Sequence, residues 1–399
     1  MYDSAHPQVA LDLAGNALAV WQQSGSAGSS IWANRYARAD GWGVPERIGV
    51  LGTTPQVSVN PDGNALAVWQ HQASVPPGAT IWASSYTAAG GWYKAERIDP
   101  RDISNATNPQ IAIDPAGNAL AVWQEDLGSS GIWQNRYTRD SGWIFYNGIV
   151  SSGAANPQVA LDPAGNALAV WQQTVNFNRD TRLDIWASRY TPAGAWGAPE
   201  RIEASNAGNA TNAQVELDQQ GKGIAIWEQF DGTRWSIWAN RYTPSGGWST
   251  AQRVESNGAG DARRPRIASD RNGNCLAAWI HSDGTRFNAW SNRYTPGGGW
   301  GTPELIEEND GDAIQLQIAV DPNGNALAVW LQSEGTHLDL WSNRYTQQGG
   351  WGTAELLETS GNKAYLPQVA ADARGNGLVV WYQSGDTPTR NDIWANRFE

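Results

Sequence analysis

Five short loops of this chain carry a basic residue directly after a threonine, and these basic residues are Arg182, Arg234, Arg286, His337 and Arg390. In three of the loops an acidic residue and a glycine come just before the pair. Arginine suits carboxylate and phosphate groups, so the five residues predict an arc that faces an anion or a polar ligand. In the alternative, each arginine pairs with the acid of its own loop and only stiffens the turn.

Aromatic residues fall in three adjacent loops of the same arc, and they are Phe177, Phe230, Trp235 and Phe287. Together they could form a platform for a ligand. However, Trp235 and Phe287 occupy a repeat position that is leucine in other copies, which predicts that they pack at the buried start of a strand. Phe177 and Phe230 are expected to be more exposed.

A second candidate set combines an arginine, a tryptophan and a glutamate, and it recurs at intervals of about 50 residues. The first copy consists of Arg35, Trp42 and Glu46, and the fourth of Arg189, Trp196 and Glu200. The set resembles the sugar sites of propeller lectins, where an aromatic ring takes the sugar face and charged groups take the hydroxyls. This resemblance implies a carbohydrate ligand. In the alternative, the arginine is structural and bonds to the neighbouring repeat.

Residue patterns typical of catalysis are weaker. The four histidines lie in separate repeats, and neither an HExxH motif nor a Gly-x-Ser-x-Gly elbow occurs. A repeated aspartate, Asp12 in the first copy, is replaced by Asn60 in the second. A hydrogen-bonding turn tolerates that exchange and an acid catalyst does not, so this position predicts a turn cap. No catalytic residue is assigned.

Cofactor and metal sites are not expected. The single cysteine, Cys275, stands where the first repeat has Ala17, which predicts a small packed side chain. The acidic segment 307–312 has oxygen ligands that Ca²⁺ could use. Its spacing departs from that of an EF-hand, so a solvated linker is the favoured interpretation.

The elements that must position these residues are eight copies of one unit. Each copy has an anchor tryptophan, and the anchors are Trp21, Trp69, Trp123, Trp171, Trp227, Trp279, Trp330 and Trp381. In the first copy, alternation of apolar and polar residues predicts four strands at 7–12, 17–23, 31–36 and 42–48. A period of about 50 residues with four strands per repeat predicts an all-β, eight-bladed propeller.

A single domain covering residues 1–399 follows from the unbroken repetition. The predicted repeats are 6–54, 55–108, 109–156, 157–212, 213–264, 265–315, 316–366 and 367–399. The Asp-x-x-Gly-Asn turn before an apolar strand resembles the NHL repeat, and Tyr190 with Trp196 resembles the end of a kelch blade. The chain therefore resembles bacterial β-propeller repeat proteins along its whole length.

The eighth repeat ends after its third strand, which predicts a last blade without its outer strand or a native chain that is longer. An uncovered strand edge there could pair with another molecule, so self-association is possible. The formal net charge of −12 argues against a nucleic-acid partner. No apolar run is long enough to span a membrane, and no signal peptide is present. The resemblance implies a secreted or envelope protein of a bacterium.

The loops between second and third strands vary from copy to copy, whereas the turns at the opposite rim hardly change. A rigid scaffold with variable loops on one rim is typical of binding sites. The sequence therefore favours a non-enzymatic, extracytoplasmic binding module that recognises carbohydrate or a protein partner. Two alternatives stay open: an enzyme, either a lyase or a glycan hydrolase, with its site at the channel mouth, and a purely structural ring.

Overall fold

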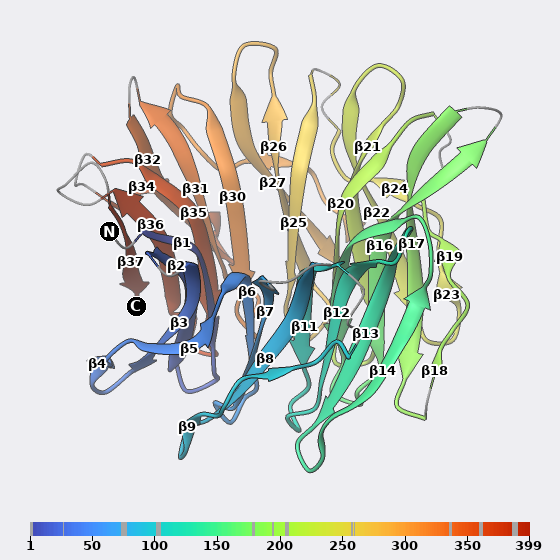
Figure 1. Ribbon diagram of the computed structural model, residues 1–399. Coiled ribbons are helices and arrows are strands. Elements are labelled where there is room, and N and C mark those ends of the chain that lie inside the picture. Colours follow the sequence, from blue (N-terminus) through green and yellow to red (C-terminus); the bar gives the residue numbers. More distant parts are fainter. Residues whose placement is uncertain are drawn as a thin grey trace.

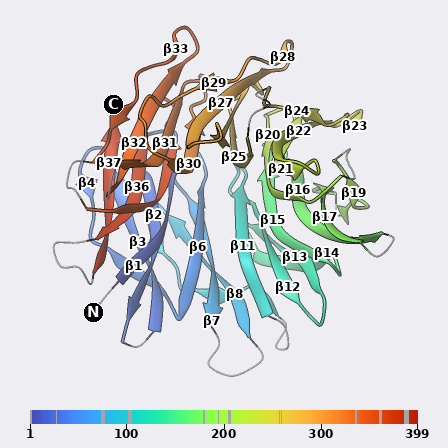
Figure 2. The ribbon, with the colours of Figure 1, turned by 90° about the horizontal axis from the view of Figure 1, so that it is seen from above.

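Eight small antiparallel sheets stand around a common axis, which confirms the predicted all-β, eight-bladed propeller (Figures 1 and 2). The computed structural model describes residues 3–26, 28–72, 78–100, 105–177, 180–193, 195–203, 207–256, 258, 260–334, 337–358, 362–384 and 390–399. Within these residues there is no helix, and so none that could cross a membrane.

Each blade begins with the strand nearest the axis. These first strands are β1 (Asp3–Leu11), β6 (Gly52–Val59), β11 (Asn105–Ile113), β15 (Ala154–Leu161), β20 (Ala210–Leu217), β25 (Ala262–Ser269), β30 (Ala313–Val320) and β35 (Ala364–Ala371). The second strands are β2 (Ala17–Gly25), β7 (Ala65–Gln72), β12 (Ala119–Asp126), β16 (Ala167–Phe177), β21 (Gly223–Phe230), β26 (Cys275–Ser282), β31 (Ala326–Glu334) and β36 (Gly377–Ser384).

The third strands are β3 (Gly28–Ala37), β8 (Ala79–Thr87), β13 (Ser130–Thr138), β17 (Asp180–Thr191), β22 (Trp235–Thr243), β27 (Phe287–Thr295), β32 (His337–Thr346) and β37 (Asn391–Phe398). The fourth strand is in two short pieces in six blades: β4 (Gly41–Trp42) and β5 (Glu46–Val50), β9 (Gly91–Trp92) and β10 (Glu96–Arg97), β18 (Ala195–Trp196) and β19 (Glu200–Arg201), β23 (Gly247–Trp248) and β24 (Gln252–Arg253), β28 (Gly299–Trp300) and β29 (Glu304–Leu305), and β33 (Gly350–Trp351) and β34 (Glu355–Leu356). In blade three it is the continuous β14 (Gly142–Val150). In blade eight, no fourth strand occurs among the described residues.

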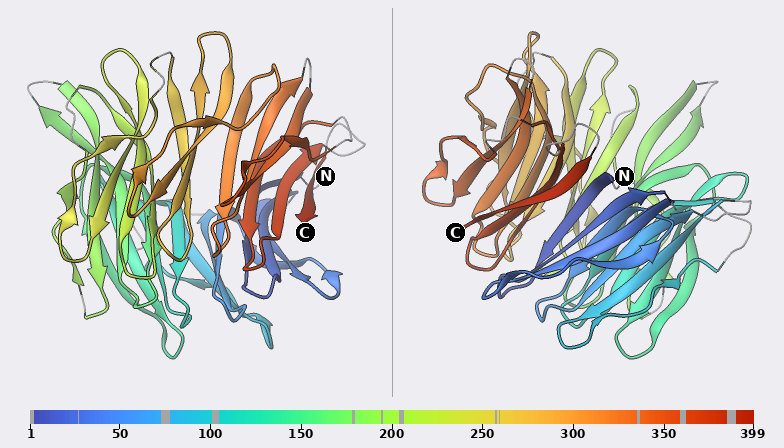
Figure 3. Two further views of the ribbon diagram at one scale, coloured as in Figure 1. Left: turned by 180° about the vertical axis from the view of Figure 1, so that it is seen from behind. Right: turned by 60° about the vertical axis from the view of Figure 1, so that its left-hand side comes forward.

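The ring closes by contact between blades eight and one, whose ends lie side by side (Figure 3). A turn contact repeats around the whole ring. A Cβ atom on Gly63 of blade two would lie 3.0 Å from Oδ2 of Asp12 in blade one, and one on Gly15 would lie 2.6 Å from Oδ2 of Asp372 in blade eight. Blades eight and one therefore meet as any two consecutive blades do.

The anchor tryptophans form the core between blades. Six of them, Trp69, Trp123, Trp171, Trp227, Trp279 and Trp330, are fully buried. Trp69 packs against Val20, Ile31 and Ile48 of the preceding blade, which shows how large and small residues interlock across each interface. Trp21 and Trp381, beside the closure, are 8% and 3% exposed. Packing is therefore tightest away from the closure.

The repeated aspartate caps its turn, as the sequence predicts. Oδ1 of Asp12 accepts hydrogen bonds from the backbone amides of Ala14 and Asn16 at 2.9 and 2.8 Å. Asn60 replaces it in blade two and accepts from Asp62 and Asn64 in the same way. An amide oxygen serves this turn as well as a carboxylate does.

Every first strand contains a β-bulge near its start, which the sequence analysis did not predict. The bulge residue has a left-handed backbone with φ between 45° and 55°, and the eight are His6, Thr54, Asn108, Asn156, Asn212, Arg264, Gln315 and Leu366. They stand at equivalent positions on the innermost strands, on the rim that carries the variable hairpins. We call these eight residues the mouth ring. Left-handed residues other than glycine are uncommon and concentrate at functional sites.

Candidate functional site

Four arginines of the predicted arc lie beside acids of their own hairpins. Nε of Arg182 lies 2.7 Å from Oδ1 of Asp184, and Nη2 of Arg390 lies 2.7 Å from Oδ1 of Asp392. Arg234 and Arg286 make longer contacts, of 3.7 and 3.6 Å, to Asp231 and Asp283. The side chain of His337 lies outside the described residues. These arginines already have a partner, and their role in ligand binding stays a prediction.

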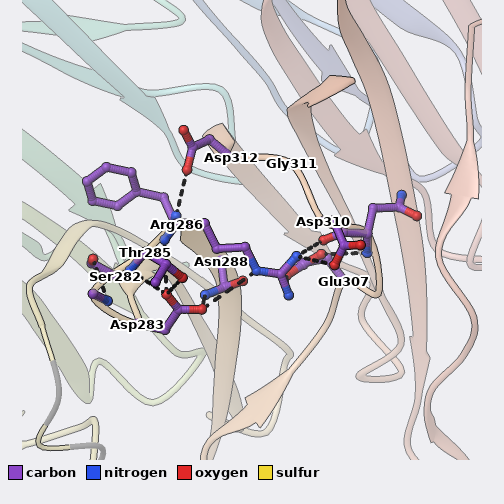
Figure 4. Close-up of polar contacts among 12 residues, drawn as sticks. Ser282, Asp283, Thr285, Arg286, Asn288, Glu307, Asp310, Gly311 and Asp312 are labelled. Carbon is purple, nitrogen blue, oxygen red and sulfur yellow. Dashed lines mark hydrogen bonds and ion pairs between the residues drawn. The ribbon is translucent and has the colours of Figure 1, made fainter. Parts of the chain in front are cut away.

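Arg286 has several partners besides Asp283 (Figure 4). Its guanidinium also lies 3.3 Å from Oδ1 of Asp310 and 3.9 Å from Oε1 of Glu307, and it donates to the carbonyl of Asn309. Asp283 accepts hydrogen bonds from the hydroxyl and amide of Thr285 at 2.6 and 2.8 Å, and these bonds lower its pKa well below the usual range. The guanidinium of Arg286 thus lies within 4 Å of three carboxylates, those of Asp283, Glu307 and Asp310.

The acidic segment 307–312 contacts this arginine, the first residue of β27 and its own backbone. Oδ1 of Asp312 accepts from the amide of Phe287 at 2.8 Å, and Oε2 of Glu307 accepts from the amide of Asn309 at 2.9 Å. No group of three His, Cys, Asp or Glu residues in the described ranges is placed to hold a metal ion.

The aromatic residues of the arc separate into different surroundings. The rings of Phe230 and Trp235 lie 5.6 Å apart and are both half-buried. Phe287 is 41% exposed, although its repeat position predicts packing. The side chain of Phe177 lies outside the described residues. The structure thus brings together one aromatic pair, in blade five.

The second candidate set links neighbouring blades. Arg189 lies over the ring of Tyr242 in the next blade at 5.9 Å. Each tryptophan of the set packs instead against the tyrosine of its own blade, at 5.5 Å for Trp196 with Tyr190 and 5.4 Å for Trp42 with Tyr36. Arg35 is half-buried, and Glu46 and Glu200 are exposed. Arginine and tryptophan of one copy therefore face different partners, and sugar binding by the set stays a prediction.

A different group of residues stands out at the channel mouth, on strand β25 of blade six. This strand reads Ala-Arg-Arg-Pro-Arg, whereas the other seven first strands contain no arginine. Arg264 is a member of the mouth ring and is exposed. Arg266 stands where all seven other first strands have glutamine. A cationic spot on the innermost strand is conspicuous in a chain of net charge −12.

A buried carboxylate in blade five holds this arginine strand in place. Glu228 is fully buried and accepts from the amide of Arg264 at 2.5 Å and from Nη2 of Arg263 at 3.1 Å. It also accepts from Thr211 and from Asn212 of the mouth ring, at 3.0 and 2.9 Å. These hydrogen bonds fix the carboxylate of Glu228, which in turn positions the strand.

The guanidinium of Arg263 has two partners, because it contacts Glu228 and also lies 4.0 Å above the ring of Trp235. Arg264 differs, since its side chain makes no hydrogen bond or ion pair with a described residue. Arg266 donates to Gln317 of blade seven and to the carbonyl of Pro265, both at 3.0 Å. Burial lowers the pKa of Arg266, and the positive charge of Arg264 lowers it further. The nearby carboxylate of Glu228 raises it, and no carboxylate of a described residue makes an ion pair with the side chain of Arg264 or Arg266.

The residue opposite Arg266 on the paired strand is small, which leaves space for the arginine side chain. Arg266 lies opposite Ala278 of β26. At this register the other second strands have valine or isoleucine, as with Val68 opposite Gln56 and Ile226 opposite Gln214. Both departures from the repeat were visible in the sequence as a break in the pattern of first and second strands.

Comparison with known proteins finds solved structures that are similar in fold and distant in sequence. No protein-family model and no curated protein matches the sequence. A polysaccharide lyase, an ulvan lyase whose structure was also solved with -[GlcA(1-4)Rha3S]-, superposes with a TM-score of 0.57 at 10% identity, over 82% of this chain and 91% of that one. A puromycin hydrolase superposes with a TM-score of 0.54 at 15% identity, over 97% of this chain and 59% of the hydrolase. An α-L-arabinanase of Penicillium chrysogenum gives 0.46 at 13% identity, over 72% and 92%.

These comparisons correct the function predicted from the sequence. The chain was expected to be a non-enzymatic binding module, and that prediction is wrong, because the ulvan lyase and the puromycin hydrolase that share its fold are enzymes. The prediction rested on repeated residues and on variable hairpins. Repeated residues mainly report the scaffold, and function has to be argued from a particular site.

Proposed function

We propose that the chain is an enzyme that cleaves an acidic polysaccharide, as a lyase or as a glycan hydrolase, at the channel mouth where blades five and six meet. The observation that carries the proposal is the pair Arg264 and Arg266 on the innermost strand β25. The likeness to an ulvan lyase supports the reaction class. The sugar named with that lyase carries a uronate and a sulfate, both of which are anions.

The electrostatics of the pair favour an anionic ligand. An arginine keeps its proton under all ordinary conditions, so the repulsion between the two guanidinium groups persists unless a counter-charge binds. A uronate carboxylate or a sulfate ester would bind them with paired hydrogen bonds. The amide of Asn212 is already fixed by Glu228 beside them, which keeps this wall of the mouth rigid.

Two titratable groups on first strands have shifted pKa values: His6 in blade one, and Glu216 in blade five, whose carboxylate contacts Ser269 at the end of β25 opposite to Arg264. Partial burial lowers the pKa of the His6 imidazole in the mouth ring below its usual value, which favours the neutral form. Burial raises the pKa of Glu216 on β20 to about 7, opposed in part by the hydroxyl of Ser269. A pKa near the working pH suits a general acid or base. In elimination, a base takes the proton beside the uronate carboxylate, and the electrons of that C–H bond form a carbon–carbon double bond. The bond to the leaving sugar oxygen breaks, and that oxygen takes a proton from a second group or from water.

The test is digestion of a sulfated, uronate-containing polysaccharide such as ulvan, with neutral arabinan as the comparison substrate. Elimination leaves an unsaturated uronate that absorbs ultraviolet light, and hydrolysis releases reducing ends without that absorbance. We expect cleavage of the acidic polymer and at least a tenfold rise in KM for Arg264→Ala, the order of effect for a lost charged contact. Arg182→Ala is the matched control, because that arginine is paired with Asp184 on the same rim.

Two results would overturn the proposal. One is the absence of product from every acidic polysaccharide tried, with folding verified by circular dichroism. The other is cleavage that Arg264→Ala and Arg266→Gln leave unchanged. Loss of kcat in His6→Ala or in Glu216→Gln, with KM unaffected, would identify which of the two groups moves the proton.

A further inference from the structure

One third strand lacks an arginine that the other seven have, and it is β8 of blade two. Ser85 stands there at the position of Arg241 in β22. Arg241 lies over the ring of Tyr294 in the next blade at 5.4 Å. The equivalent of Tyr294 for blade two is Tyr137 of blade three, and the short side chain of Ser85 cannot cover its ring.

The missing side chain leaves a groove between blades two and three. Between blades five and six, where Arg241 is present, the equivalent space has a volume of about 30 Å³. Beside Ser85 its volume is about 370 Å³. Small-molecule sites measure roughly 300–1,000 Å³, so the groove is large enough for a ligand. Tyr137 is half-buried in the groove, whereas Tyr294 is buried beside Arg241.

A second departure from the repeat leaves an amide in this groove without its usual acceptor. In blade one the side-chain amide of Asn16 donates to Oδ2 of Asp12 at 2.8 Å. Asn60 replaces this aspartate in blade two, and its own amide donates to the carbonyl of Pro115 at 3.3 Å. Asn64, the equivalent of Asn16, lines the groove, and its side chain makes no hydrogen bond with a described residue. Asn64 can therefore both donate to a ligand and accept from it.

A third departure adds an aromatic ring to the groove. Tyr93 follows β9 at a position that is glycine in blades one, four, six and seven. It is 55% exposed and lines the groove together with Tyr86 and Tyr137. The amide of Tyr93 donates to the carbonyl of Ser85 at 2.8 Å, which fixes the tyrosine backbone beside the serine. Three exchanges that are separate in sequence thus meet at one place in the fold.

The charge of the groove indicates the class of ligand. Arg139, in the turn after β13, lines the groove and is exposed. Its side chain makes no hydrogen bond or ion pair with a described residue, and no carboxylate is among the described residues that line the groove. An anionic group is therefore favoured over a cation. A sugar ring can pack its C–H face on a tyrosine, and its hydroxyl groups can bond to an amide.

We propose that this groove binds a uronate unit of an acidic polysaccharide, as a second site on the rim opposite to the mouth. Arg139 binds the carboxylate, Tyr93 packs on the sugar face, and Asn64 bonds to a hydroxyl group. Asn64 ends the turn before β7, on the rim that β9 marks at the lower edge of Figure 1. The choice of ligand rests on the proposed function. A polymer bound at two sites dissociates more slowly than one bound at the mouth alone.

The test is isothermal titration calorimetry with a tetrasaccharide of ulvan, which contains glucuronate and sulfated rhamnose. The full chain carries Arg264→Ala and Arg266→Gln, because these substitutions remove the two cations of the mouth and leave the groove as it is. Circular dichroism verifies that this chain is folded. We expect it to bind one tetrasaccharide per chain.

Substitution of the groove arginine tests the charge. Arg139→Gln, made in addition, should weaken binding about tenfold, the order of effect for a lost charged contact. Arg38→Gln is the matched control and should leave binding unchanged. Arg38 is exposed at the equivalent turn of blade one, where Arg397 lies over the ring of Tyr36.

Restoring the residues of the repeat tests the shape of the groove. Ser85→Arg should abolish binding and raise the thermal midpoint of the chain, because the new guanidinium fills the groove and covers Tyr137. A higher midpoint together with lost binding distinguishes a filled groove from a damaged fold. Tyr93→Gly should weaken binding severalfold, since it removes the exposed ring.

Three outcomes would overturn the inference: no binding by the chain with the two mouth substitutions, binding that Ser85→Arg leaves unchanged, and binding of arginine amide in place of the tetrasaccharide. The last result would assign the groove to a guanidinium group like the one that other blades place there. Cleavage is not measured in these experiments. A chain that cleaves ulvan without binding it in the groove would contradict this inference alone, and binding without cleavage would contradict the proposed function alone.

Discussion

The guanidinium of Arg397 donates from Nη1 to the hydroxyl of Tyr36 at 2.6 Å and lies 5.4 Å from the centre of its ring. These residues belong to blades eight and one. Arg241 lies over Tyr294 of the following blade at the same 5.4 Å. The contact that consecutive blades use therefore also fastens the two ends of the chain, where no covalent link holds the blades together.

Loss of this contact should loosen the closure of the ring. We expect Arg397→Ala to lower the free energy of unfolding by about 1–3 kcal/mol, the sum of a charge-assisted hydrogen bond and a cation–π contact. Arg241→Ala is the control, because its blades stay joined by the chain. Unfolding rates in denaturant should rise more for Arg397→Ala, and equal effects would show that closure is not the weak point.

Truncation of an anchor tryptophan should be severe. Trp171 is fully buried against Val122, Ile132 and Ile149 of blade three, and its indole donates to Gln173 at 3.1 Å. We expect Trp171→Ala to cost about 3–5 kcal/mol, since it leaves a large cavity between two blades. Urea denaturation measures the loss, and Trp394→Ala, at an exposed tryptophan, should cost far less.

The pH dependence of stability should reveal a buried carboxyl between blades two and three. Burial raises the pKa of Asp99 to about 6, against the opposing effect of Arg97, and the nearby Glu125 raises it further. The folded chain thus holds this proton more tightly than the unfolded chain, where an aspartate has a pKa near 3.9. The associated stability is present in full below about pH 4 and is lost as the pH rises to about 6.

The substitution Glu125→Gln tests whether the raised pKa of Asp99 causes this pH dependence. Gln229, Gln332 and Gln383 occupy the position of Glu125 in other blades and donate to the carboxylates there, as in the 2.9 Å contact of Gln229 with Glu203. Glu125→Gln removes a negative charge and offers the same donor to Asp99. Thermal midpoints measured from pH 4 to pH 7 should fall less steeply for this variant. A slope unchanged from that of the original chain would contradict the assignment.

Arg266→Gln should raise the stability of the fold and lower the activity. It restores the residue that every other first strand has and removes a cation whose pKa burial depresses. We expect the free energy of unfolding to rise by about 1 kcal/mol, since a crowded cation is replaced by an amide that keeps the hydrogen bond to Gln317. Turnover of the acidic polysaccharide should fall in the same variant. A less stable and fully active variant would argue that Arg266 is structural.

Sequence periodicity predicted the strands well, because alternating apolar residues and Gly-Asn turns act locally. The first strand of blade one was predicted at 7–12 and is observed at Asp3–Leu11. The difference comes from the bulge at His6, whose left-handed backbone lets the strand continue past a proline. A bulge depends on pairing with another strand, and single-sequence patterns do not report it.

The candidate site was predicted less well, for a physical reason. Arg182 and Arg286 stood out because their loops vary, and the structure shows each beside an acid of its own hairpin. Arg264 and Arg266 lie within a strand that the sequence analysis treated as scaffold. Which residues of a repeat face a shared axis depends on how the blades stand around it.

The sequence alone determined that this chain is a propeller of eight blades, because strand alternation, turn caps and anchor tryptophans are all encoded within one repeat of about 50 residues. Only the tertiary structure decided which side chains meet. It brought Glu228 of blade five to the arginines of blade six, and Arg397 to Tyr36 across the whole length of the chain. Such contacts arise from packing between blades, and residues far apart in sequence carry no local signal of them.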